Sequence, residues 1–83
     1  MSVTNKIKIA MLHRGKKNAD IAECLQISDK GVRGKFTRNS FFADDLIKIA
    51  DSLGYKLAFV DGDEKIFFEG SDVKSNKAED QAD

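Results

Sequence analysis

The 83 residues are enough for one small domain and too few for two. With 41% hydrophobic and 34% charged residues, the composition is that of an ordinary globular protein, and no apolar run approaches the roughly 20 residues of a membrane-spanning helix. The first residues lead into no signal-peptide core, and a single cysteine excludes an internal disulfide, so we expect a cytoplasmic protein without a membrane partner.

The formal net charge of zero hides two unlike halves. Residues 1–40 hold nine Lys and Arg against three Asp and Glu, a balance of +6, whereas residues 41–83 hold five against eleven, a balance of −6. A basic half beside an acidic half indicates a localised surface for a polyanion. The alternative is that the charges are scattered by chance over a solvated surface.

The first predicted helix begins after Thr4 or Asn5 as its cap and ends at about Arg14, before Gly15. Its buried stripe has helical spacing and consists of Ile7, Ala10 and Met11. A second helix is predicted to begin at residue 17 or 18. Its apolar face is formed by Ile21, Ala22 and Leu25.

The third predicted helix follows a turn, and Ser28 is placed to cap it. Gly31 and Gly34 each cost about 1 kcal/mol against alanine in a helix interior. Val32 and Phe36, four residues apart, would attach this helix to the core. We therefore expect a real but frayed helix; the alternative is a segment that is partly loop.

Phe42 is expected to open the next buried segment, and a fourth helix is predicted from Ala43 to its stop at Gly54. Its apolar stripe comprises Leu46, Ile49, Ala50 and Leu53, widened by Ile47. Residues 56–60 and 65–69 are rich in strand-favouring residues, and residues 61–64 between them have turn chemistry. They predict a β-hairpin.

The predicted hairpin is apolar on both faces and so needs two covers. The helices would supply one cover and a second copy of the chain the other; the residues expected at this dimer contact are Leu57, Phe59, Ile66, Phe67 and Phe68. The alternative is a hairpin folded wholly onto its own helices. The expected organisation is a mainly α domain over residues 1–69, with its C-terminal hairpin at about 55–69, and a disordered acidic tail over 70–83.

Little in the sequence has the pattern of a catalytic site. His13 is interpreted as a surface or capping residue and Cys24 as a small packing residue. The sequence has no Cys or His pair at metal-ligand spacing and no Gly-rich phosphate loop. We therefore expect no enzyme, no cofactor and no small-molecule ligand.

Several motifs resemble the Xre-like helix-turn-helix family of phage repressors and Cro proteins. Ile21-Ala22 is similar to the family's Leu-Ala, and Leu25-x-Ile27-Ser28 to its Leu-Gly-Ile-Ser, while residues 42–54 are similar to its following helix. Gln26 departs from the family's glycine, which predicts a strained or altered turn. Lys35 stands where the family has a core residue, with Phe36 taking that place.

This resemblance covers about residues 6–54 and implies a four-helix lambda-repressor-like domain whose third helix enters the major groove of DNA. It implies base contacts from Asp29, Lys30 and Arg33. Phosphate contacts are implied for Lys17, Asn18 and Ser28, with further attraction from Lys35 and Arg38.

The expected function is that of a transcriptional regulator, a repressor that binds double-stranded operator DNA as a homodimer. The alternative is a protein-interaction module, such as an antirepressor or an antitoxin-like partner, that uses the apolar hairpin and the acidic tail.

Overall fold

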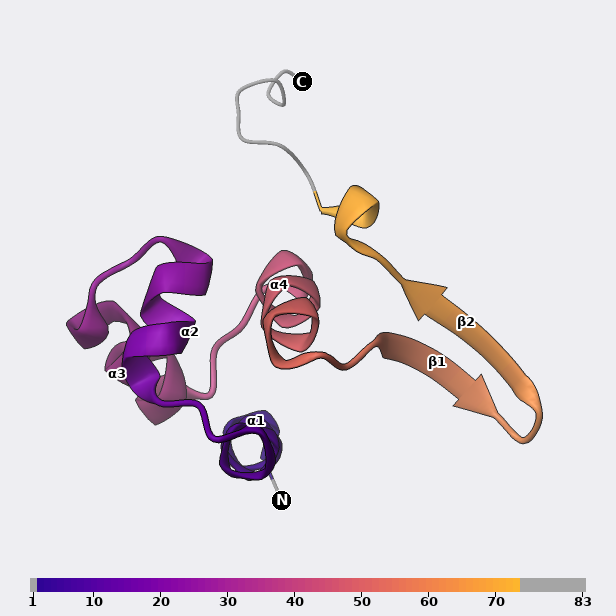
Figure 1. Cartoon of the computed structure of the whole chain (residues 1–83), viewed down its shortest axis with the longest axis horizontal. Helices are drawn as coiled ribbons and strands as arrows, with labels where there is room; N and C mark the ends of the chain where they lie inside the picture. The colour runs from indigo at the N-terminus through magenta and orange to yellow at the C-terminus, as the bar shows by residue number, and fades with distance from the viewer. Residues whose placement is uncertain (1, 74–83) are drawn as a thin grey trace.

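A computed structural model describes residues 2–73 of the protein, which form four helices followed by a two-stranded antiparallel hairpin and a short 3-10 helix (Figure 1). The elements are α1 (Val3–Arg14), α2 (Asn18–Leu25), α3 (Asp29–Arg38), α4 (Ala43–Leu53), β1 (Leu57–Asp61), β2 (Glu64–Phe68) and η1 (Gly70–Asp72). The predicted fold class, mainly α with a C-terminal hairpin, is confirmed. Within the described residues, the structure has no helix long and apolar enough to cross a membrane.

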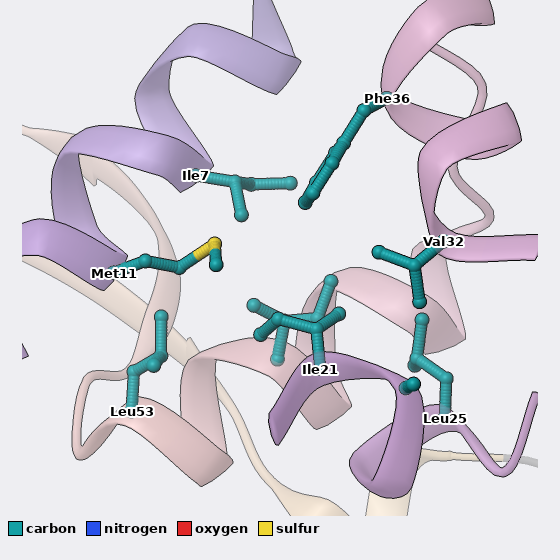
Figure 2. Close-up of a cluster of buried hydrophobic side chains, with 9 residues drawn as sticks. Ile7, Met11, Ile21, Leu25, Val32, Phe36 and Leu53 are labelled. Atoms are coloured by element: carbon teal, nitrogen blue, oxygen red, sulfur yellow. The ribbon is translucent and has the colours of Figure 1, made fainter. Parts of the chain in front are cut away.

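The core is built by all four helices, whose apolar faces converge on one cluster (Figure 2). Ile21 of α2 and Val32 of α3 lie at its centre, with exposed fractions of 0% and 1%. Buried around them are Ile7, Met11, Ala22, Leu25, Phe36, Ile49 and Leu53. These are residues that the helical periodicity placed on buried faces, because each recurs at the spacing of one helix side.

The ends of α1 and α4 lie where their glycines predict. Gly15 and Gly54 both adopt the left-handed conformation, with φ of +67° and +81°, which glycine accepts without a Cβ clash. The cap of α1 was predicted wrongly. Ser2, not Thr4 or Asn5, is the cap, and its Oγ accepts a hydrogen bond from the N–H of Asn5 at 3.0 Å. Thr4 lies inside the helix and is buried against α3.

Helix α3 is continuous over its ten residues, so the alternative of a partly looped segment is wrong. Its two glycines cost about 2 kcal/mol together. Burial of Val32 and Phe36 contributes about 1.5–3 kcal/mol for each side chain and outweighs that cost. The fraying of this helix stays a prediction.

The position of Phe42, just before α4, differs from the prediction. Phe42 was expected to be buried, but 72% of it is exposed. Its backbone stands at the N-cap of α4, where its N–H donates to Asp45 Oδ2 at 3.0 Å and its side chain points away from the core. Phe41 packs instead against Phe36, with the two ring centroids 5.9 Å apart.

The hairpin extends away from the helices as an arm (Figure 1). A two-residue turn, Gly62-Asp63, joins strands in the register Leu57↔Phe68 to Asp61↔Glu64, so the turn is shorter than predicted. Gly62 has a φ of +60°, which suits the first central position of a primed hairpin turn. Because the strands point away from the helices, four apolar side chains of the hairpin are between 52% and 66% exposed: Phe59, Val60, Ile66 and Phe67.

Two further expectations about the C-terminal part are therefore corrected. The hairpin is not folded wholly onto its own helices, because only its base, which includes Leu57 and Phe68, is half-buried. The disordered tail was expected to begin at residue 70, but Gly70–Asp72 form η1 near α4, where Asp72 Oδ2 accepts the N–H of Glu69 at 2.8 Å. The remainder of the predicted tail, 74–83, lies outside the described residues.

Replacing Gln26 by glycine is expected to stabilise the protein. Gln26 has a φ of +59°, and the left-handed conformation costs a residue with a Cβ about 1–2 kcal/mol. Gln26→Gly should therefore raise the free energy of unfolding in urea by about 1 kcal/mol, whereas Gln26→Ala, which keeps a Cβ, should change it little. A destabilised Gln26→Gly variant would show that this turn is not strained.

Candidate nucleic-acid interface

The turn between α2 and α3 is held by backbone bonds that require the left-handed conformation at Gln26. The N–H of Gln26 donates to Glu23 O at 3.2 Å, and the N–H of Ile27 donates to Ala22 O at 3.0 Å. The side chain of Ile27 packs against the core. Because Gln26 carries a Cβ, its left-handed conformation leaves this turn strained.

Ser28 sets the start of α3, as its sequence position predicts. Its Oγ accepts the N–H of Gly31 at 3.0 Å, and its carbonyl accepts the N–H of Val32 at 3.0 Å. Asp29 follows in the first helical turn and is exposed there, where the helix dipole favours a negative charge.

The outward side of α3 forms a shallow, basic surface that we call the basic face of α3. It is lined by Ser28, Lys30, Gly31, Arg33, Gly34, Thr37 and Arg38. Residues 30, 33, 34 and 37 share one side of a helix, while Val32 and Phe36 point from the other side into the core. The structure therefore brings together Ser28, Lys30, Arg33 and Arg38 from the predicted set.

Gly34 lies under the side chain of Arg38. A Cβ placed there would lie 3.0 Å from Arg38 Nη1 and 3.4 Å from Nη2. The guanidinium of Arg38 therefore lies back across the helix at Gly34, one turn before its own Cα. Sequence analysis did not include Gly34 and Thr37 in the site, although their spacing from Lys30 and Arg33 could have identified them.

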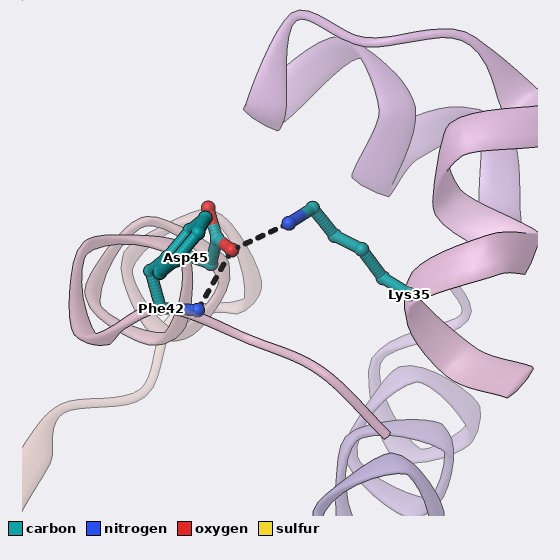
Figure 3. Close-up of polar contacts among 3 residues, drawn as sticks. All are labelled: Lys35, Phe42 and Asp45. Atoms are coloured by element: carbon teal, nitrogen blue, oxygen red, sulfur yellow. Dashed lines mark hydrogen bonds and ion pairs between the residues drawn. The ribbon is translucent and has the colours of Figure 1, made fainter. Parts of the chain in front are cut away.

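Lys35 is placed apart from the other predicted DNA-binding residues. Its Nζ lies 2.9 Å from Asp45 Oδ2 and so bridges α3 to α4, next to the bond from the N–H of Phe42 (Figure 3). The Lys35 side chain is 18% exposed, and its Nζ also lies 5.0 Å from the ring centroid of Phe42. Its position three residues after Val32 indicates this inward location.

Lys17 and Asn18 stand at the start of α2. The N–H of Lys17 donates to Asp20 Oδ2 at 2.8 Å, which closes the N-terminal turn of the helix. Lys17 is exposed and Asn18 half-buried, so the Lys17 ammonium is available to an anion. The first backbone N–H groups of a helix also favour anions.

Helix α3 is tied to α1 by a pair of hydrogen bonds that sequence analysis missed. Thr4 Oγ1 donates to the carbonyl of Phe36 at 2.9 Å, and the N–H of Thr4 donates to Asn39 Oδ1 at 2.8 Å. Asn39 ends α3 in the left-handed conformation, with a φ of +52°. No local pattern predicts these bonds, since their partners lie 32 and 35 residues apart.

The two residues considered for chemistry lie elsewhere. Cys24 is half-buried, and its Sγ donates to the carbonyl of Lys48 at 3.2 Å. Burial raises the pKa of this thiol, which disfavours the nucleophilic thiolate. His13 is exposed in the last turn of α1. Residues 2–73 contain no group of three or more His, Cys, Asp or Glu side chains suited to a metal ion.

Removal of the Thr4 hydroxyl is expected to loosen α3. Thr4→Val keeps the shape but removes this donor from the carbonyl of Phe36, which still accepts the N–H of Asn39 at 3.2 Å, so it should lower the free energy of unfolding by about 0.5–1.5 kcal/mol. Thr4→Ser keeps the hydroxyl and should cost less. Urea unfolding followed by circular dichroism measures both changes; equal stability of wild type and Thr4→Val would contradict the anchoring role.

Comparison with protein-family models, curated proteins and solved structures finds no match to this chain. The resemblance to Xre-like proteins therefore stays a prediction from the residues. The case for a function depends on the geometry of α2 and α3.

Proposed function

We propose that this protein is a sequence-specific DNA-binding regulator of transcription, which represses by occupying operator DNA as a homodimer. The observation that supports this most is the basic face of α3. Lys30, Arg33 and Arg38 lie on it, and no carboxylate is among the described residues that line it. Such a surface suits a polyanion that approaches α3 from outside.

The shape of α3 supports insertion into a major groove. A ten-residue helix is about 15 Å long, and the major groove is about 12 Å wide and admits one helix. Gly31 carries no side chain on this face, so a ligand can approach the helix backbone there, whereas the backbone at Gly34 lies under the Arg38 guanidinium. Because Val32 and Phe36 fix the opposite side, the helix need not reorganise to present this face.

The side chains on α3 have the chemistry of base recognition. The Arg33 guanidinium can donate two hydrogen bonds to guanine, and Lys30 can donate to the same base edge. Asp29 is not among the residues that line the basic face; it lies in the first turn of α3, from which it can accept from cytosine. Lys17 and the turn at Ser28 are suited to phosphates, which position a protein on DNA without reading its sequence. Lys35 has no part in this proposal, because Asp45 already holds its ammonium.

A protein-interaction module is the second candidate, and the exposed hairpin favours it. Phe59 and Val60 are 66% and 64% exposed, and neighbouring exposed apolar side chains of this size are typical of a surface that contacts another protein.

A gel shift with a random-sequence duplex separates the two candidate functions. A DNA-binding protein should shift this duplex at low salt and release it at moderate salt, whereas an interaction module should shift it at neither.

Sequence preference should depend on Arg33 and Lys30. Operator sequences can be selected from a randomised duplex pool with the wild-type protein, and affinity can then be measured by fluorescence anisotropy. Arg33→Ala should weaken binding to the selected duplex by about 1–3 kcal/mol, with a smaller loss on random duplex, because a base contact is lost. Lys30→Ala should act in the same direction.

The matched control for these variants is Lys65→Ala, which also removes one exposed positive charge, but from the hairpin at the far end of the molecule (Figure 1). It should leave the affinity for selected DNA nearly unchanged. If Arg33→Ala and Lys30→Ala both kept the affinity and preference of the wild type, the assignment of α3 as the recognition helix would be wrong.

Lys17 should contribute to affinity without contributing to preference. Removing one phosphate contact reduces the dependence of log affinity on log salt concentration by about 0.9. Lys17→Ala should therefore flatten this slope by about one unit and weaken binding to selected and random duplexes equally. The measurement is a salt titration of both duplexes; an unchanged slope would remove Lys17 from the interface.

A further inference from the structure

The structure contains an apolar groove that the proposed DNA interface does not use. It lies between α1, α4 and the base of β1 and has a volume of about 380 Å³. Its floor is apolar and includes Ile7, Leu46, Ile49 and Leu53, and its charged lining residues are Lys6 and Lys56. A groove of this kind, open to water in a small domain, is suited to an apolar partner.

The hairpin has two unequal faces. Side chains alternate along each strand, so the register places Leu57, Phe59, Ile66 and Phe68 on one face, here called the inner face. The opposite, outer face carries Ala58, Val60, Lys65 and Phe67, whereas the inner face ends at the hairpin tip in the acidic pair Asp61 and Glu64. On the inner face, the rings of Phe59 and Phe68 lie edge to face, with their centroids 5.2 Å apart, and form a firm apolar ridge.

The groove and the inner face form one continuous apolar surface. Leu57 belongs to both, because it lines the groove and begins the inner face. The hairpin does not cover the groove of its own chain. Only Tyr55 and Lys56 separate Leu57 from the end of α4 at Gly54, and Phe59 and Ile66 remain 66% and 56% exposed.

We infer that the groove receives the hairpin of a second copy of this chain, and that two copies exchange hairpins around a two-fold axis. The inference rests on the homodimer of the proposed function and gives it an interface. The inner face of each hairpin, led by Phe59 and Ile66, packs into the groove of its partner. A two-fold axis makes both contacts at once and closes the assembly at two copies.

Size and charge support this occupant. A five-residue strand spans about 17 Å, and the eleven residues of α4 span about 16 Å. The hairpin tip is acidic, with Asp61, Asp63 and Glu64. Helix α1, on one side of the groove, has no Asp or Glu and presents Lys6 at the rim. An acidic tip against a basic rim favours this orientation of two copies.

Adjacent residues on opposite faces of β1 supply a matched test. Phe59 and Val60 are 66% and 64% exposed, but only Phe59 has a ring contact within the hairpin, with Phe68, so the two aspartate variants are compared after each is shown to keep the circular dichroism spectrum of the wild type. At micromolar concentration, multi-angle light scattering should give a dimer for the wild type and Val60→Asp and a monomer for Phe59→Asp. A monomeric wild type, or equal effects of the two variants, would overturn the inference and leave the groove to another partner.

A charge exchange tests the same contact without touching an apolar residue, in case Phe59→Asp fails to keep its helical circular dichroism. Lys6→Glu and Glu64→Lys should each raise the dimer dissociation constant about tenfold, and the double variant should recover most of that loss. Additive losses in the double variant would refute the predicted pairing. The mass of the assembly is measured without DNA and tests the hairpin exchange alone. Binding to random duplex depends on α3 and tests the DNA-binding proposal, so the two proposals can fail separately.

Discussion

The packing of Val32 and Phe36 into the core, with the Thr4 hydroxyl on the Phe36 carbonyl, holds a helix that its own sequence would leave weak. Two glycines cost α3 about 2 kcal/mol, and burial of the two apolar side chains offsets this. The position of the basic face of α3 depends on this anchoring. Because Val32 and Phe36 face the core, Lys30 and Arg33 lie on the outward side of the helix.

The molecule separates its charged and apolar surfaces. The basic face lies on α3, whereas the exposed apolar arm and its acidic tip lie at the other end of the long axis (Figure 1). Between them, the Lys35–Asp45 pair bridges α3 to α4 (Figure 3). In the proposed function, this separation would keep the acidic hairpin away from the phosphates that α3 approaches and leave the hairpin to a second copy.

Sequence patterns predicted the four helices, the hairpin and most of the core, because Ile21, Leu25 and their counterparts recur at helical spacing and Gly15 and Gly54 end their helices. The patterns failed where a long-range contact decides. Thr4 has a side chain suited to a helix cap, but its hydroxyl donates instead to the carbonyl of Phe36, which is 32 residues away in the sequence. Neither the choice between adjacent phenylalanines before α4 nor the direction of the hairpin follows from local sequence. The inward position of Lys35 could have been inferred from its spacing to Val32.

The claim that α3 carries the DNA interface is tested most directly by mapping backbone amide signals in nuclear magnetic resonance spectra while a duplex selected by the protein is added. The account predicts that the largest shifts fall on residues 28–38 and at the start of α2, near Lys17, with the strand amides around Phe59 and Ile66 little changed. Shifts concentrated in the hairpin, with α3 unaffected, would contradict it.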